Sequence, residues 1–153
     1  MNDAQPTSEA SEAVALNTLK QNFCPAQTIL VVEDETFVRE IIAEILESAG
    51  YRVLKARSAA EAKVALQGCA ENLRLLLTDM ILPGQNGREL ANDLKELNAA
   101  LRVICISGYS LNLTTQKRFI EDGIFYFPKP FSAESLLRKV RQVLANDLEE
   151  LAI

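Results

Sequence analysis

Short apolar runs alternate with segments of helical periodicity along most of this chain, and this alternation limits the available folds more than any other feature. The runs cover residues 28–32, 51–55, 73–78, 101–106 and 124–127. Three of them are nearly continuous in apolar residues, which is typical of strands that are covered on both faces. Five strands alternating with five helices predict a parallel sheet with right-handed crossovers, and hence a three-layer (βα)5 sandwich.

The segments between these runs carry helix signals. Apolar residues repeat at helical spacing over 38–49, and Gly50 then supplies a stop. Capping patterns open further helices at three places: Ser58-x-x-Glu61, Asn86 with Glu89, and Ser132. Gly68 is the expected stop of the helix that Ser58 opens. Segment 110–121 has apolar residues without a clear period, so we expect a short or irregular fourth helix there.

The length of 153 residues suits one domain with a single core, which we place at residues 27–148. Residues 1–26 are polar and are expected to form a tail or linker with at most a weak helix, and 149–153 to form a short C-terminal tail. No apolar run approaches the length of a bilayer span, and the N-terminus lacks a signal-peptide pattern. We therefore expect a cytoplasmic protein that is not inserted in a membrane.

Charge and composition exclude several kinds of function. A net charge of -5 argues against a nucleic-acid-binding face, which needs clustered lysine and arginine. The chain has no histidine, which excludes histidine zinc sites, Ser-His triads and any role as a phosphohistidine donor. Its chemistry must therefore use carboxylates, hydroxyls, lysines or a metal.

Acidic residues follow two of the predicted strands. Glu33 and Asp34 come directly after the first apolar run, and Asp79 comes directly after the third. In open α/β sheets, ligands bind beyond the carboxyl ends of the strands, near the point where the strand order reverses. Carboxylates that converge there raise one another's pKa unless a cation intervenes, and an oxygen-only cluster with few protein ligands suits Mg²⁺.

A lysine and a serine follow the last two strands. Lys129 lies in Phe-Pro-Lys-Pro-Phe just beyond the fifth run, and Ser107 lies in Cys-Ile-Ser-Gly after the fourth. Alone, Lys129 is explained by a surface turn and Ser107 by capping of the next segment. Their position at consecutive strand ends, in register with the acids, instead indicates one shared site.

The motifs at these strand ends occur together in one known family. They are Val-Val-Glu-Asp-Glu at 31–35, Leu-Thr-Asp-Met at 77–80, Leu-Pro-Gly-Gln-Asn-Gly at 82–87, Ile-Ser-Gly at 106–108 and Pro-Lys-Pro at 128–130. In this order and spacing, the chain resembles the receiver domain of two-component response regulators over residues 28–148. The resemblance implies a flavodoxin-like fold with strand order 2-1-3-4-5.

The resemblance assigns roles to the acids. Asp79 corresponds to the phosphoacceptor, a carboxylate nucleophile that forms an acyl phosphate. Asp34 corresponds to the direct Mg²⁺ ligand, and Glu33, where the family often has aspartate, to an acid that binds the metal through water. The backbone carbonyl of Ile81 is the implied third protein ligand.

Further roles are implied for the residues after the last two strands. Lys129 and Ser107 would contact phosphate oxygens, and Ser107 and Tyr126 would form the switch pair. The alternative for Tyr126 is an ordinary strand aromatic that takes no part in switching. A cis peptide bond is implied between Lys129 and Pro130. Ile81 is apolar and cannot orient an attacking water, so we expect a long-lived phosphorylated state.

The resemblance therefore predicts a phosphorelay receiver whose partner is a histidine kinase or a histidine phosphotransferase. Such a protein catalyses its own phosphorylation and dephosphorylation and signals, rather than acting as a conventional enzyme. Only five residues follow Leu148, so we expect a single-domain regulator without an output domain. Two alternatives remain open, the receiver of a hybrid histidine kinase and a phosphorylation-independent pseudo-receiver. A partner or a second copy is expected to contact the face formed by residues 110–148.

Overall fold

A computed structural model describes residues 28–108, 114, 117–118 and 123–152, with the side chains of residues 71 and 146–152 left out. Its centre is a sheet of five parallel strands in the order β2-β1-β3-β4-β5. The strands are β1 (Thr28–Val32), β2 (Arg52–Ala56), β3 (Leu75–Asp79), β4 (Arg102–Ser107) and β5 (Ile124–Pro128). The helices are α2 (Thr36–Ser48), α3 (Ala59–Ala65), α4 (Gly87–Leu97), α6 (Ala133–Ala152) and the 3₁₀ helix η1 (Ala70–Asn72). The predicted strand order is thereby confirmed.

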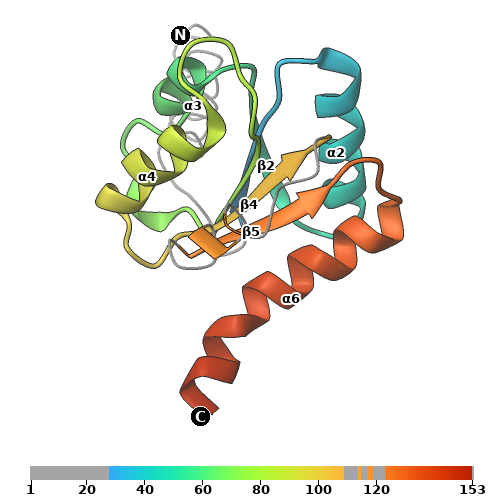
Figure 1. Ribbon diagram of the computed structural model, residues 1–153, viewed down its shortest axis with the longest axis vertical. Coiled ribbons are helices and arrows are strands. Elements are labelled where there is room, and N and C mark those ends of the chain that lie inside the picture. The colour runs from blue at the N-terminus through green and yellow to red at the C-terminus, as the bar shows by residue number, and fades with distance from the viewer. Residues whose placement is uncertain (1–27, 109–113, 115–116, 119–122, 153) are drawn as a thin grey trace, which may run out of the picture.

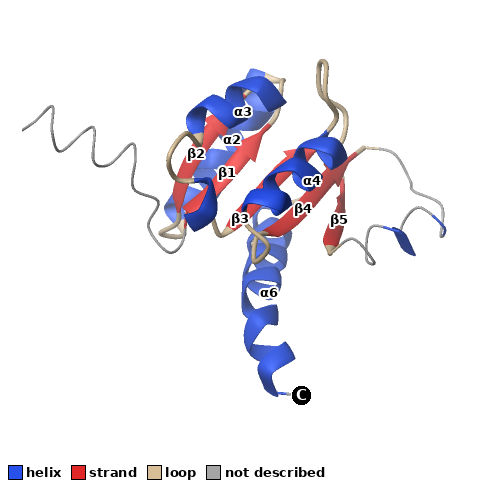
Figure 2. Cartoon of the chain, turned by 90° about the vertical axis from the view of Figure 1, so that its left-hand side faces the viewer, coloured by secondary structure: helices blue, strands red, loops and turns tan. Residues whose placement is uncertain are grey.

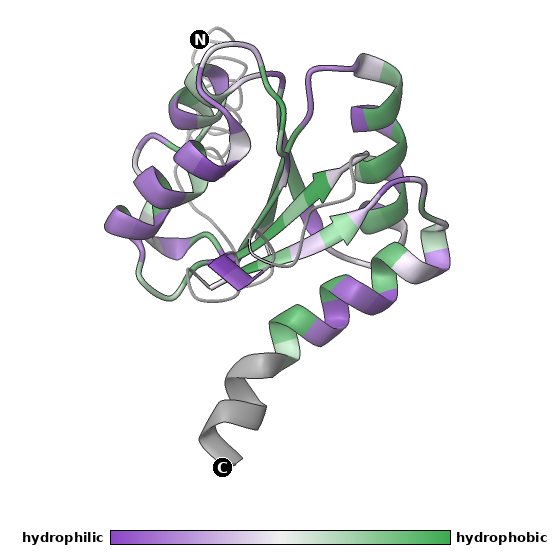
Figure 3. Cartoon of the chain, in the orientation of Figure 1, coloured by the Kyte–Doolittle hydropathy of each residue, from purple (hydrophilic) through white to green (hydrophobic). Residues whose placement is uncertain are grey.

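Helices cover both faces of the sheet, as the continuous apolar strands predicted. Helices α3 and α4 lie on one face, and α2 and α6 lie on the other (Figures 1 and 2). Alternate residues of β1 supply the two cores, since Leu30 packs with the α3 and α4 residues and Ile29 with those of α2 and α6. Figure 3 shows this pattern as apolar strands between helices whose outer faces are hydrophilic.

The ends of the helices follow the predicted capping signals only in part. Ser58 accepts a hydrogen bond from the Glu61 backbone, but the Glu61 carboxylate pairs with Arg57 at 3.2 Å, so the expected capping box is only half formed. Asn86 and Glu89 form the complete reciprocal box. Helix α3 ends at Ala65, before the expected stop at Gly68, because the backbone continues as tighter turns.

Some predictions fall on parts of the chain that the structure leaves out. The tail over 1–26 lies outside the described residues, and so does most of the expected fourth helix over 110–121. Among the described residues, no helix combines the length and apolar character needed to cross a membrane. The parallel register brings the ends of β1, β3 and β4 to one edge, with Val32 beside Thr78 and Asp79 beside Ile106.

Candidate functional site

The three acids that were singled out from the sequence converge at this edge. Asp79 is the last residue of β3, and Glu33 and Asp34 form the connection from β1 to α2. One carboxylate oxygen from each of the three residues lies within 4.8 Å of the other two. Glu33 is buried, with only 4% of its side chain exposed, whereas Asp34 is exposed. The prediction that strand ends bring these acids together is confirmed.

Lys129, in the connection from β5 to α6, reaches into the same cluster. Its Nζ lies 2.9 Å from Asp79 Oδ2 and 3.4 Å from Glu33 Oε2. The Lys129 backbone N–H donates to the Ser107 carbonyl at 2.8 Å, which fixes the start of the β5–α6 connection against the end of β4. The Lys129–Pro130 peptide is cis, as the resemblance implied.

Burial and the close approach of the charged groups shift the pKa values of two acids in the cluster. Burial, together with the neighbouring Asp79 carboxylate, raises the pKa of Glu33 to about 7. Burial also acts to raise the pKa of Asp79, but hydrogen bonds with Glu33, Lys129 and the Ile81 backbone outweigh it and hold that pKa below its ordinary value. Asp79 is therefore the ionised member of the pair near neutral pH, where Glu33 is only partly ionised.

Asp79 is held from its backbone as well as from its carboxylate. The Ile81 N–H donates to Asp79 Oδ1 at 3.0 Å, and the Thr78 hydroxyl donates to the Asp79 carbonyl at 2.9 Å. Gly87, the first residue of α4, packs so closely that a Cβ at this position would overlap the Asp79 carbonyl oxygen. The start of α4 therefore packs directly against the backbone of Asp79.

The serine and tyrosine of the implied switch pair lie on one face of the sheet. Ser107 is buried at the end of β4, with 1% of its surface exposed. Tyr126 lies opposite Cys105 in β5 and packs, partly buried, against the core on the α3 and α4 side. Side chains alternate between the two faces along a strand, so Ser107 lies on the same face as Cys105 and its neighbour Tyr126. Ser107 and Tyr126 are therefore diagonal neighbours on adjacent strands.

These elements enclose a cavity of about 340 Å³ at the sheet edge. Its lining residues are Glu33, Asp34, Glu35, Asp79, Ile81, Gly108 and Lys129. Carboxylate oxygens without nitrogen or sulfur ligands form the donor set that Mg²⁺ prefers, and three such oxygens converge here. The residues present therefore fit a magnesium site.

Two residues that shape the site were missed in the sequence. Gly87 belongs to the motif at 82–87, but nothing local in the sequence showed what its missing side chain avoids. Arg39 is buried, and its guanidinium binds the Glu33 carbonyl. Its signal was available, since Arg39 lies three residues before Ile42 and seven before Leu46, on the apolar face of α2.

Comparison with known proteins assigns the family. The profile of the response regulator receiver domain matches residues 29–141. The chain is 30% identical over 116 residues to the response regulator receiver protein CpdR of Brucella abortus, covering 76% of this chain and 95% of that protein. The CheY-like receiver domain of Methanospirillum hungatei JF-1 superposes with a TM-score of 0.70 at 30% identity, covering 81% of this chain and 98% of that one. The chain belongs to the response regulator receiver domain family.

Other relatives are much longer than the matched region. The chain is 29% identical over 117 residues to the sensor kinase CckA of Brucella abortus, which covers 76% of this chain but 12% of that kinase. It spans between 12% and 52% of the length of the first seven curated relatives. Receiver domains therefore occur in this family both nearly alone and as parts of larger proteins.

Proposed function

We propose that this receiver is a phosphorelay protein that accepts a phosphoryl group from a phosphohistidine onto Asp79. The observation that carries the proposal is the environment of the Asp79 carboxylate, which is ionised, held by two donors and open to the cavity. A carboxylate oxygen would attack phosphorus, the P–N bond to the donor imidazole would break, and an acyl phosphate would form. The retention of every acid and of Lys129 favours this function over that of a pseudo-receiver.

The acidic residues would hold Mg²⁺ during this transfer. Asp34, Asp79 and the Ile81 carbonyl are the proposed direct ligands, and Glu33 the proposed ligand through water. When bound, Mg²⁺ supplies positive charge that offsets the charge developing on the phosphoryl oxygens. Lys129 already bridges Asp79 and Glu33, so its ammonium group is placed to bind one of the oxygens of a phosphoryl group on Asp79.

Phosphorylation would be communicated through Ser107 and Tyr126. The buried Ser107 hydroxyl would turn toward a phosphoryl oxygen, and Tyr126 would move further into the space on the same face of the sheet. Their position as diagonal neighbours supports this pairing. Such an element has two states, and the added charge at Asp79 would shift the population between them.

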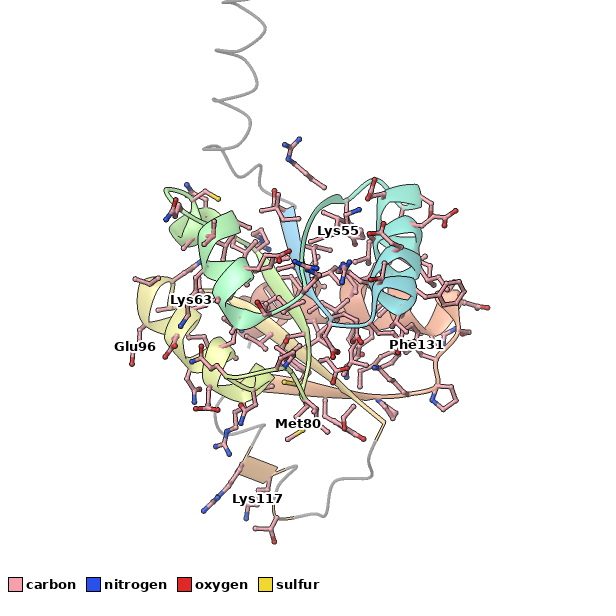
Figure 4. All side chains as sticks on the ribbon, turned by 90° about the horizontal axis from the view of Figure 1, so that it is seen from above. Lys55, Lys63, Met80, Glu96, Lys117 and Phe131 are labelled. Atoms are coloured by element: carbon pink, nitrogen blue, oxygen red, sulfur yellow. The ribbon has the colours of Figure 1, made fainter. Side chains whose placement is uncertain are left out.

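The surface beside the cavity supports a protein as phosphoryl donor. Phe37 and Ile41 at the start of α2 are exposed, and with Pro130 and Phe131 they line an apolar groove of about 520 Å³. The groove also touches Gly108 and Lys129, so it adjoins the cavity of the site. Figure 4 shows Phe131 on the α2 side of the sheet, away from Lys63 on α3. The groove offers an apolar surface next to the reactive carboxylate, and the apolar face of a helix from a histidine kinase or histidine phosphotransferase would fit it.

Two contexts fit the same chemistry. CpdR, which this chain covers almost completely, supports a stand-alone receiver without an output domain. The match to the sensor kinase CckA supports the alternative of a receiver that serves a hybrid kinase. In both contexts we propose contact with proteins rather than nucleic acid, through the groove beside α2 and the face formed by residues 110–148.

The proposal is tested by phosphorylation in vitro. The protein is incubated with Mg²⁺ and acetyl phosphate, and its intact mass is measured before and after treatment with hydroxylamine, which cleaves acyl phosphates. We expect a gain of one phosphoryl group that hydroxylamine removes and that requires Mg²⁺. The absence of any gain in the native protein would reject the proposed function in favour of a pseudo-receiver.

The affinity for Mg²⁺ is expected to increase with pH through the pKa of Glu33. That pKa is raised to about 7, so below this pH a proton competes with the metal for the site. Competition by one proton with a pKa near 7 weakens binding about tenfold between pH 8 and pH 6. Isothermal titration calorimetry at several pH values measures the change. Glu33→Gln should remove the pH dependence, and a slope unchanged by that substitution would contradict the assignment.

The same titration affects the stability of the metal-free protein. The folded state binds the Glu33 proton more tightly than the unfolded chain, whose pKa is near 4.5. The resulting stabilisation is fully present below about pH 4.5 and is lost as the pH rises through about 7. This contribution to stability decreases as the pH rises, whereas stabilisation by bound Mg²⁺ increases. The two effects can therefore be separated by measuring stability with and without the metal.

Replacing Ile81 with asparagine is expected to shorten the lifetime of the phosphorylated state. The Ile81 side chain is 56% exposed and lines the cavity, where it offers no polar atom to an attacking water. An orienting hydrogen bond worth about 0.5–1.5 kcal/mol in the transition state would accelerate hydrolysis roughly 2- to 12-fold. Loss of the added mass with time measures the rate, and Ile81→Val, which remains apolar, is the control. An Asn variant that keeps its phosphate as long as the native protein does would contradict this role.

A further inference from the structure

A buried arginine lies directly behind the acidic site. Arg39, the fourth residue of α2, is only 8% exposed. Its Nη1 donates to the Glu33 carbonyl at 2.9 Å, and its Nη2 lies 3.5 Å from the Thr36 hydroxyl oxygen. Both partners precede Arg39 in the chain, so the side chain folds back over the first turn of its own helix toward the end of β1.

This placement is unfavourable on general grounds. A cation near the N-terminus of a helix opposes the helix dipole, and a buried charge normally requires an ionic partner. Among the described residues, no ion pair joins Arg39 to a carboxylate, and its hydrogen bonds go to neutral oxygens.

The arginine completes the anchoring of Glu33. The Glu33 N–H donates to the Ala56 carbonyl at the end of β2, at 3.0 Å, and the Glu33 carbonyl accepts from Arg39. Both backbone polar groups of Glu33 are therefore fixed, one to the sheet and one to α2. This fixes the peptide that joins Glu33 to Asp34, and with it the direction in which both acidic side chains leave the backbone.

We propose that Arg39 is a positioning residue for the acidic site, which holds the Glu33–Asp34 peptide so that both carboxylates face the cavity. Arg39 is not among the residues that line the cavity, and it acts through the backbone of the acids. The inference rests on the proposed function, since it concerns the Mg²⁺ affinity that phosphorylation requires. Residues that orient metal ligands in this way typically contribute 10- to 100-fold to metal affinity.

The test compares Arg39→Met, Arg39→Lys and the native protein. We expect Arg39→Met to weaken Mg²⁺ binding at least about tenfold by calorimetry. Its phosphorylation by acetyl phosphate should slow at low Mg²⁺ and recover as the Mg²⁺ concentration is raised. Arg39→Lys keeps the charge and a donor, so its Mg²⁺ affinity should lie between those of the native protein and Arg39→Met. Arg138→Met is the matched control, because Arg138 is an exposed residue of α6 paired with Glu134 at 3.0 Å.

The melting temperature without Mg²⁺ separates positioning from simple stabilisation. If Arg39→Met melts earlier but binds Mg²⁺ as the native protein does, Arg39 is only a structural brace and the proposal is overturned. If Arg39→Met does not fold, Arg39→Gln, which is neutral but polar, takes its place with the same expected loss of affinity. Failure of the native protein to bind Mg²⁺ would overturn the proposed function together with this inference, whereas native-like binding by both neutral variants would overturn the inference alone.

Discussion

Replacing Asp79 with asparagine is expected to abolish phosphorylation while leaving the fold intact. The amide has no anionic oxygen to attack phosphorus, and no other carboxylate of the cluster is as well prepared. Glu33 is partly protonated at neutral pH because its pKa is raised to about 7. Ile81 and Lys129 donate to Asp79 and not to Asp34. Incubation with Mg²⁺ and acetyl phosphate should therefore produce no mass gain above background.

The stability of this variant should change little. Ile81 and Lys129 donate to different Asp79 oxygens, so asparagine can keep one of these two hydrogen bonds and loses the other. The neutral amide also removes the repulsion between the Asp79 and Glu33 carboxylates, which offsets this loss. Asp93→Asn is a matched control, since Asp93 is a carboxylate of α4 that pairs with Lys63 at 2.8 Å outside the site. Phosphorylation that persists in Asp79→Asn would move the acceptor to another residue, and its loss in Asp93→Asn would indicate a general effect of the substitution.

The sequence located the acidic site because its residues follow buried strands. A carboxylate directly after an apolar run must lie at the carboxyl edge of a parallel sheet, so Glu33, Asp34 and Asp79 could be placed together without any tertiary information. Lys129 followed from the same reasoning applied to the last strand. The strand order came from the family resemblance, and the structure confirms it.

The residues that hold the site in place were harder to predict, because their role depends on contacts between elements. The spacing of Arg39 from Ile42 and Leu46 places it on the apolar face of α2, but spacing does not show that its guanidinium binds the Glu33 carbonyl. Likewise, the half-formed capping box at Ser58 reflects competition, since the Glu61 carboxylate binds Arg57 instead of returning to the helix start. Such competition between partners cannot be decided from spacing alone.

Replacing Gly87 with alanine is expected to damage both the stability and the chemistry of the site. A Cβ at Gly87 would overlap the Asp79 carbonyl oxygen and would lie 3.1 Å from the Thr78 hydroxyl oxygen. Neither neighbour can rotate away, because the Asp79 carbonyl belongs to the backbone of a central strand and the Thr78 hydroxyl donates to that carbonyl. Overpacking of this kind costs about 1–3 kcal/mol, which exceeds the gain of roughly 0.5–1 kcal/mol from removing a helical glycine.

The chemistry should be affected more than the stability. Relief of the overlap must move either the start of α4 or the end of β3, and Asp79 is the residue at that contact. A displacement approaching 1 Å at a reacting group lowers rates by about 100-fold, so phosphorylation by acetyl phosphate should slow by one to two orders of magnitude. Urea denaturation and the initial rate of mass gain measure the two effects.

Gly108→Ala provides the control for the loss of stability, because a Cβ at Gly108 meets no atom within 4 Å. If Gly87→Ala is destabilised but phosphorylated at the native rate, the backbone relaxes through α4 and Asp79 stays in place. If both properties are unchanged, the close approach of α4 to β3 is not a constraint at all. The expected combination, a moderate loss of stability with a large loss of rate, would show that the position of Asp79 is set by the packing of a helix that contributes no side chain at that point.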